Sequence, residues 1–237
     1  MDICDYKGVI RVEISVPEGR EAAAKTFNPR LGIEGGISIL GTSGIVEPMS
    51  TKALLDTIRV ELRQKRALGF TSAAVTPGNY GKDFLKNTYG YDIDRSVKCS
   101  NYIGDTIDMA AELGFDSIIL TKLIKVAGGI MNTHSKEGDC RMELLAAAAI
   151  RAGADSNTAL HILDAVTTED ALDIISNASD GHNSLLEATM ACVLDKVMQN
   201  LTRRAGDRLH IECMIYSNSY GMLAKSPQAE DMLKNNI

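Results

Sequence analysis

The stretch FTSAAVTPGNYG, residues 70–81, decides the fold class. Its first six residues are uncharged and mostly apolar, which predicts a strand over 70–75. The Pro77-Gly78-Asn79-Tyr80-Gly81 sequence that follows predicts a loop that opens a short helix. A strand that runs through such a loop into a helix is the first half of a parallel β-α-β unit.

The same order continues downstream. A second strand is predicted over 97–100, and the spacing of Ile103 and Ile107 predicts a helix that ends at Gly114. A third strand, over 117–120, is apolar enough to be covered on both faces. Alternating strands and helices are typical of an α/β fold with a mainly parallel sheet and helices on both faces.

Further elements are predicted on the N-terminal side of this region. Apolar and polar residues alternate over 12–16, which predicts a half-buried strand. A short helix over 20–26 and a buried strand over 36–40 follow. A helix then begins after Ser50, which can cap it, and ends at Gly69.

On the C-terminal side, residues 139–152 predict an alanine-rich helix, and 167–170 predict a capped helix start. Residues 184–201 predict a long amphipathic helix. Alternation over 209–215 predicts a final strand at an edge of the sheet.

The composition excludes several classes of protein. Apolar residues make up 45% of the 237 residues, and the net charge is −6, so no broad positive surface for nucleic acid or an anionic membrane is expected. The longest apolar run, 144–150, is too short to span a bilayer, and no secretory signal is present. Five scattered cysteines without C-x-x-C predict a cytoplasmic protein without disulfides, and no metal-binding pattern occurs.

Three polar loops follow predicted strands, at residues 41–44, 77–81 and 100–102. The carboxyl ends of parallel strands form the edge where ligands bind in open α/β sheets. Each loop alone is equally well explained as a polar turn. Together they predict one shared ligand cleft, which Thr42, Asn79 and Asn101 should line.

Familiar nucleotide motifs are missing from the sequence. The loop over 41–44 lacks the lysine of a P-loop, and no G-x-G-x-x-G occurs. The strand over 70–75 is followed by Thr76-Pro77 and not by the acid that holds a ribose hydroxyl. Binding of NAD or ATP is therefore disfavoured.

The segment AGGIMNTHS, residues 127–135, is unlike a core segment because glycines, Asn, Thr and His stand in a row. His134 is a candidate general acid or base near pH 7. The alternative is a surface histidine at a helix cap. Lys122, Lys125 and Lys136 flank the segment, where they could bind carboxylates or simply form a solvated cationic face.

Longer stretches resemble a known family. TFNPRLGIEGGISILGTSGIVEPMS, residues 26–50, closely resembles the signature of the cobalt-precorrin-5B (carbon 1) methyltransferase family, the CbiD family. Residues 77–81, 99–104 and 127–135 resemble it as well.

This resemblance implies an S-adenosylmethionine-dependent methyltransferase of anaerobic cobalamin biosynthesis, which converts cobalt-precorrin-5B to cobalt-precorrin-6A. The substrate is a carboxylate-rich tetrapyrrole that carries the cobalt, so no metal site in the protein is implied. The family fold has two α+β domains, of which the C-terminal one resembles a reduced methyltransferase fold. The oligomeric state is left open.

Two departures from the family pattern affect the expected organisation. Members usually carry a sizeable N-terminal domain before the counterpart of Met1, so one methyltransferase-like domain is expected over 1–237. Members also carry a Gly-His-Ile-Gly-Lys stretch, which is shortened here to TKLIKV over 121–126. We therefore expect the chain alone to transfer methyl groups poorly. The alternative is a non-catalytic module that keeps a tetrapyrrole or S-adenosylmethionine pocket.

The resemblance also suggests roles for individual residues. His134 is the candidate catalytic base. The candidate donor-binding residues lie in the strand-end loops: Gly41, Thr42, Ser43, Gly44, Gly78, Asn79, Ser100 and Asn101. The candidate substrate-binding residues are Arg30, Lys122, Gly129, Asn132 and Thr133.

Overall fold

A computed structural model describes residues 8–26, 34–37, 51–92, 95–134, 138–178 and 184–234, without the side chains of residues 79, 80, 82, 83 and 184. The chain divides into two compact units, Met1–Ser50 and Thr51–Ile237. The second unit holds a β-sheet, its flanking helices and a pocket lined by several charged residues.

The first unit contains helix α1 (Gly19–Ala24), which confirms the short helix expected over 20–26. The strand expected over 12–16 is wrong: the segment has no strand structure, and Val12 and Ile14 are 74% and 65% exposed. Alternation produces a strand only where a neighbouring strand bonds the backbone and covers one face. None of the described residues pairs with this segment. The strand expected over 36–40 lies largely outside the described residues.

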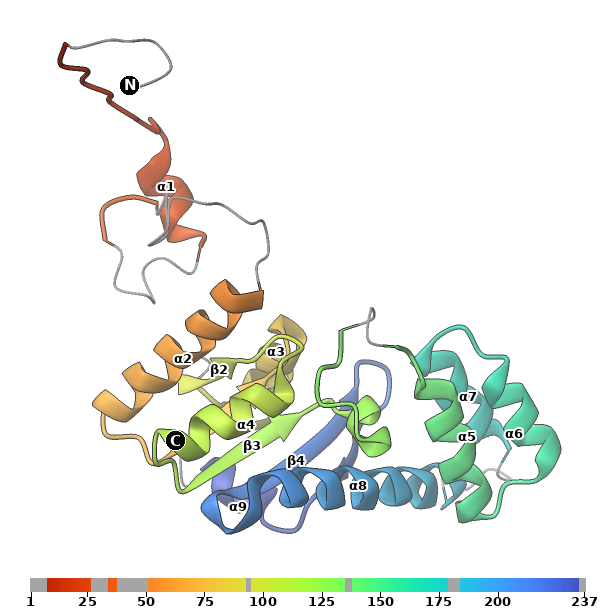
Figure 1. Cartoon of the computed structure of the whole chain (residues 1–237). Helices are drawn as coiled ribbons and strands as arrows, with labels where there is room; N and C mark the ends of the chain where they lie inside the picture. Colours follow the sequence, from red (N-terminus) through yellow and green to blue (C-terminus); the bar gives the residue numbers. More distant parts are fainter. Residues whose placement is uncertain are drawn as a thin grey trace. The chain divides into compact units, whose positions relative to one another are not determined.

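The second unit is built on one mixed sheet. Its strands are β1 (Ser72–Thr76), β2 (Val97–Lys98), β3 (Ser117–Thr121), β4 (His210–Ser217) and β5 (Gly221–Lys225). The order is β2-β1-β3-β4-β5, and each neighbouring pair is parallel except β4 and β5 (Figure 1). The expected α/β class with a mainly parallel sheet is confirmed.

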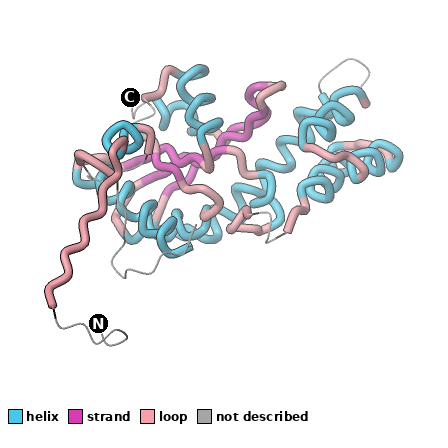
Figure 2. Tube along the Cα trace, turned by 90° about the horizontal axis from the view of Figure 1, so that it is seen from above, coloured by secondary structure: helices cyan, strands magenta, loops and turns pink. Residues whose placement is uncertain are grey.

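Helices lie on both faces of this sheet, as expected (Figure 2). α2 (Thr51–Ala67), α4 (Ile103–Glu112) and α8 (Ser184–Ala205) pack on one face. α3 (Asn79–Tyr89) and α9 (Ala229–Lys234) pack on the other. The alternation of strand side chains explains the division, because Ala73 and Val75 belong to the first core whereas Ala74 belongs to the second.

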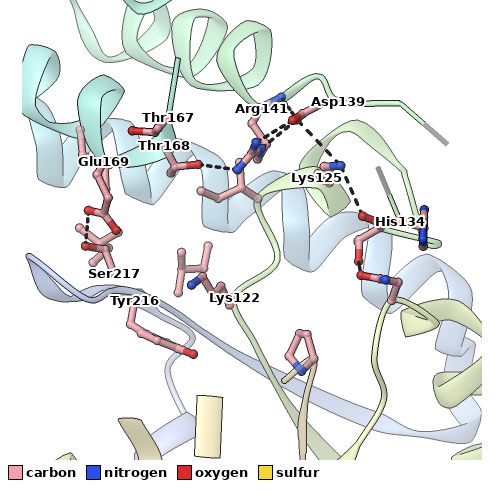
Figure 3. A pocket seen from close by; sticks show the side chains of 17 residues that line it. Lys122, Lys125, His134, Asp139, Arg141, Thr167, Thr168, Glu169, Tyr216 and Ser217 are labelled. Carbon is pink, nitrogen blue, oxygen red and sulfur yellow. Dashed lines mark hydrogen bonds and ion pairs between the residues drawn. The ribbon is translucent and has the colours of Figure 1, made fainter. Parts of the chain in front are cut away.

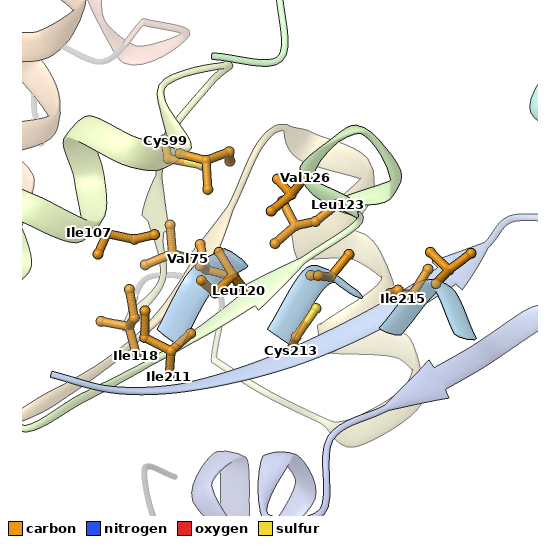
Figure 4. Packing of buried hydrophobic residues seen from close by; sticks show 14 of the residues in the cluster. Val75, Cys99, Ile107, Ile118, Leu120, Leu123, Val126, Ile211, Cys213 and Ile215 are labelled. Carbon is orange, nitrogen blue, oxygen red and sulfur yellow. The ribbon is translucent and has the colours of Figure 1, made fainter. Parts of the chain in front are cut away.

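The larger core extends to the carboxyl ends of the strands. Val75 of β1, Leu120 of β3 and Cys213 of β4 lie in it, and Leu123 and Val126 continue it beyond β3 (Figure 4). Residues that leave the sheet at this edge therefore start from tightly packed positions.

A group of helices lies beside the carboxyl ends of the strands (Figure 1). It consists of η3 (Ile124–Gly128), a 3₁₀ helix, and of α5 (Arg141–Ala152), α6 (Ser156–Leu163) and α7 (Thr168–Asn177). The expected capped start of α7 is confirmed: Thr167 Oγ1 accepts the N–H of Asp170, and Asp170 accepts the N–H of Thr167. A short 3₁₀ helix, η5 (Gly206–Arg208), connects α8 to β4.

The strand expected over 209–215 is present as β4, but it is neither the final strand nor at an edge of the sheet. β4 lies between β3 and β5, and β5 takes the edge. Glu212, a charged residue in the middle of β4, is buried, with His210 Nε2 2.9 Å from its Oε1 and its Oε2 accepting the N–H of Gln228. The Oγ of Ser217 accepts the N–H groups of the next turn, from which Gly221, with a φ of 69°, starts β5.

Candidate functional site

A pocket of about 630 Å³ lies at the carboxyl ends of the parallel strands. β2 lies on one side of β1 and β3 on the other, so the direction of strand addition reverses between β1 and β3. Open α/β sheets bind ligands at such a reversal, outside the carboxyl ends of the strands. Pro77, which follows β1, and Lys122, which follows β3, both line the pocket.

The sheet supplies one side of the pocket, here called the strand wall. Its members are Pro77, Asn101, Lys122, Tyr216 and Ser217. Lys122 Nζ lies 5.7 Å from the centroid of the Tyr216 ring. The same ring stacks on Phe84 of α3, with the centroids 4.0 Å apart. The buried Tyr216 ring thus connects Lys122 to helix α3 behind the strand wall.

The helical group supplies the opposite side, here called the helical wall, formed by Lys125, Asp139, Arg141, Thr168 and Glu169 (Figure 3). Arg141 donates to both oxygens of Asp139, from Nε at 2.8 Å and from Nη2 at 2.6 Å, and to Thr168 Oγ1 at 3.1 Å. This hydrogen bonding lowers the pKa of Asp139 to about 2. The pair is therefore ionised at neutral pH.

The two remaining charged groups of the helical wall differ in what they contact. Lys125 Nζ donates to the backbone carbonyls of Gly138 at 2.9 Å and Thr133 at 3.3 Å, so it holds the loop beside the pocket. Glu169 Oε2 accepts the hydroxyl of Ser217 at 2.8 Å. That hydrogen bond ties the start of α7 to the end of β4.

Two non-glycine residues in the described part of the chain have left-handed backbone conformations, Ser100 with a φ of 51° and Lys122 with a φ of 62°. Both stand just beyond strand ends at the edge where the pocket lies. Such a conformation is unfavourable for a residue with a Cβ, and strained residues cluster at functional sites. The backbone of Lys122 is held there by a hydrogen bond from its N–H to Met214 O.

The pocket brings together several of the predicted site residues. Asn101, Lys122, Thr133 and His134 line it. Thr133 binds Asn101 twice, through its N–H to the carbonyl at 2.9 Å and through its hydroxyl to Oδ1 at 3.3 Å. Figure 3 shows His134 at the margin of the pocket, beyond Lys125.

Other predicted residues lie near this edge without lining the pocket. Gly78 precedes α3 as its N-cap, and Gly129 ends η3. Asn132 pairs with Tyr102 in an isolated bridge, and its Oδ1 accepts the N–H of His134. Ser100 belongs to the turn between β2 and α4.

The remaining predicted residues cannot be placed. Asn79 is the first residue of α3, but its side chain is not described. Arg30 and the loop residues Gly41, Thr42, Ser43 and Gly44 lie outside the described residues. Pro77 of the loop after β1 and Asn101 of the loop after β2 line one pocket, whereas the shared ligand cleft of all three loops stays a prediction.

Sequence reasoning missed Asp139, Arg141, Glu169 and Ser217. The Thr167-Thr168-Glu169-Asp170 run predicts only a helix start, which it is. The acidic first turn was itself a possible signal for a binding site, because acidic residues at the start of a helix can contact a ligand beside it as well as stabilise the helix. Only the packing of α7 beside the end of β4 shows which site that is.

The described residues form neither a metal site nor a membrane span. No group of three or more His, Cys, Asp or Glu side chains among them could hold a metal ion. In the same part of the chain, no helix combines the length and apolar character needed to cross a membrane.

The fold and the pocket define an open α/β protein with a pocket, lined by several charged residues, at the carboxyl edge of its sheet. Residues 132–227 match the family model "CbiD, C-terminal domain", and residues 1–48 match the model "CbiD". Together the two matches cover more than half of the chain. The chain belongs to the CbiD family, as the sequence motifs indicated.

Curated relatives support the same assignment. Proteins from Ruminiclostridium cellulolyticum and Thermoanaerobacter sp. are 46% and 44% identical over 90% and 93% of this chain. One from Salmonella typhimurium is 43% identical over 80%. All three are named cobalt-precorrin-5B C(1)-methyltransferase. The aligned regions span 55%, 60% and 51% of the three relatives, so the chain corresponds to little more than half of their length. No solved structure matches the chain.

Proposed function

We propose that this protein acts in the methylation of cobalt-precorrin-5B at ring carbon 1, with S-adenosylmethionine as donor and cobalt-precorrin-6A as product, in anaerobic cobalamin biosynthesis. The observation that carries the proposal is the name shared by relatives that are 37–46% identical to the chain. A cytoplasmic location is part of the same proposal.

The pocket has the chemistry that such a donor requires. S-adenosylmethionine carries a carboxylate, an ammonium group and ribose hydroxyls. Arg141 offers N–H donors, Glu169 offers a carboxylate, and Asn101 and Thr168 offer neutral polar groups. The volume of about 630 Å³ falls within the range of roughly 300–1,000 Å³ typical of small-molecule sites.

We assign the donor to the strand-end loops, as the family resemblance suggests. Gly78 and Asn79 follow β1, and Ser100 and Asn101 follow β2, so these residues reach the same edge of the sheet. The loop over 41–44 is assigned to the donor on the resemblance alone.

The tetrapyrrole is assigned to the segment around Gly129, Asn132 and Thr133. That segment begins at the end of η3 and enters the pocket wall at Thr133. Lys125 holds it through the Thr133 carbonyl, which keeps a cation beside the position where an acidic substrate would lie. Lys122 and Arg30 are the two further candidates that the sequence offers for the substrate's carboxylates.

When bound, the donor supplies a methyl group from a sulfonium, and the sulfur keeps the electron pair of the broken bond. The residues of the chain then have to hold the acceptor carbon in line with that methyl group. Such positioning contributes about 7–11 kcal/mol to lowering a reaction barrier. His134 is assigned to accept the proton that the substrate loses, from its place at the margin of the pocket.

The test is transfer of a labelled methyl group from S-adenosylmethionine to cobalt-precorrin-5B. Two proteins are compared: the chain alone, and the chain joined to the part of the Ruminiclostridium cellulolyticum relative that it does not match. We expect transfer by the joined protein and weak transfer by the chain alone. Binding of both ligands without transfer in either protein would contradict the proposal and favour a non-catalytic binding module.

The role of His134 has its own variant and control. His134→Gln in the joined protein should slow transfer by about 100-fold or more, because a general base typically contributes at least that much. His161→Gln changes a histidine on α6 that does not line the pocket, and should leave the rate unchanged. Equal rates for both variants would remove His134 from the mechanism.

A further inference from the structure

The pocket contains charges of both signs. Lys122, Lys125 and Arg141 are cationic, whereas Asp139 and Glu169 are anionic. Arg141 and Asp139 engage each other through two short hydrogen bonds and largely cancel. A ligand in the pocket is therefore exposed mainly to the other three groups.

Lys125 is held by the loop beside the pocket. Its ammonium group donates to two backbone carbonyls of the loop that ends at Gly138, and its side chain is mostly buried. Lys122, which is exposed on the strand wall, and Glu169, on the helical wall, are charged groups of opposite sign that line the pocket from different elements. Figure 3 shows both side chains directed into the cavity from opposite walls.

The position of Glu169 is fixed by the fold. It stands in the first turn of α7, whose start is held by the capping box of Thr167 and Asp170. Ser217 at the end of β4 donates to Oε2 at 2.8 Å, which orients the carboxylate. A carboxylate held in this way repels a ligand that carries only carboxylates. The same group attracts a ligand with an ammonium group.

We propose that Glu169 and Lys122 together bind an α-amino acid group. Glu169 accepts hydrogen bonds from its ammonium, and Lys122 donates to its carboxylate. This inference rests on the proposed function, because the methionine end of the methyl donor carries such a group. It assigns Lys122 to the donor instead of the tetrapyrrole, and it gives Glu169 a role that neither the sequence motifs nor the relatives' names assign.

The binding of the ammonium and the binding of the carboxylate can be measured separately with three ligands, by titration calorimetry with the full chain. S-adenosylhomocysteine has both the ammonium and the carboxylate. Decarboxylated S-adenosylmethionine keeps the ammonium, beside its sulfonium, but lacks the carboxylate, and 5′-methylthioadenosine has neither the ammonium nor the carboxylate. Glu169→Gln should weaken the first two ligands by about 10- to 100-fold, as for loss of a hydrogen bond to a charged group. Its affinity for 5′-methylthioadenosine should stay within about twofold.

Lys122→Met should give a different pattern. It should weaken S-adenosylhomocysteine by about 10-fold or more and leave the other two ligands within about twofold, because they lack the carboxylate. Asp173→Asn is the control, since it removes a negative charge from the same helix as Glu169, at a residue that bonds Tyr220 and does not line the pocket. It should leave all three affinities unchanged.

The outcomes also separate this inference from the proposed function. Equal losses for all three ligands in Glu169→Gln, or no loss, would overturn the inference even if methyl transfer occurs. The expected pattern without any methyl transfer to cobalt-precorrin-5B would support the inference and contradict the proposed function. No binding of S-adenosylhomocysteine to the unmodified chain would overturn the inference together with the assignment of the donor.

Discussion

The strand wall and the helical wall of the pocket are held in place by different forces. The strand wall continues a hydrogen-bonded ladder whose neighbours are buried, such as Thr76 and Thr121. The helical wall depends on polar contacts such as that of Asp139 with Arg141, whose side chains are 45% and 37% exposed. Changes under the strand wall should therefore reduce folding stability, whereas changes in the helical wall should mainly alter ligand binding.

The largest effect is expected from Gly81→Ala, beneath the strand wall. A Cβ at Gly81 would lie 2.9 Å from Thr76 Cβ and 3.1 Å from Thr121 Oγ1, so α3 would have to move away from the sheet. The free energy of unfolding, measured by chemical denaturation, should fall by about 1–3 kcal/mol.

Gly78→Ala is the matched control for that measurement. No atom lies within 4 Å of a Cβ at Gly78, and its backbone is extended. Its stability should stay within about 0.5 kcal/mol of the unmodified protein. Equal stabilities of the two variants would show that the end of β1 is not packed as described.

Much of the strand wall was predictable from sequence because its signals are local. Pro77, Asn101 and Lys122 each follow a short apolar run, and parallel strands bring their carboxyl ends to one edge. The alternation over 12–16 wrongly predicted a strand, and the alternation over 209–215 wrongly predicted an edge position. A pattern of side chains does not tell whether a neighbouring strand is present, nor whether a polar residue finds partners inside the protein.

The helical wall was not predictable from the sequence. Glu169 and Arg141 are 28 positions apart and reach the pocket only through the packing of α5 and α7 with α8. Their residue types are ordinary for helix starts. The contact from Ser217 to Glu169, 48 positions apart, has no local signal at all.

A smaller effect is expected from the left-handed backbone of Lys122. Glycine adopts a φ of 62° without the penalty of a Cβ, although it also makes the unfolded chain more flexible. Lys122→Gly should therefore be more stable than Lys122→Met, by up to about 1 kcal/mol in chemical denaturation, and both should bind S-adenosylhomocysteine weakly. A less stable glycine variant would contradict the strain at this position.

The smallest effect on stability is expected from the pH response of the helical wall. Arg141 lowers the pKa of Asp139 from 3.8 to about 2, so the pair favours the folded state above pH 3.8 and loses this contribution as the pH falls towards 2. The contribution should be under about 1 kcal/mol because the pair is partly exposed. Carboxyl ¹³C shifts should show Asp139 titrating near pH 2 in the unmodified protein, and near its ordinary value in Arg141→Gln. A midpoint close to that ordinary value in the unmodified protein would mean that the pair does not form.

The central claim is that the methyl donor binds at the carboxyl edge of the sheet, between the two walls. The most direct measurement is the change in backbone amide NMR shifts of the full chain when S-adenosylhomocysteine is added. We predict the largest changes at Asn101 and Lys122 on the strand wall and at Thr168 and Glu169 on the helical wall, with little change in α9 on the other side of the sheet. Large changes confined to α9, or to residues 8–26 of the first unit, would contradict the claim.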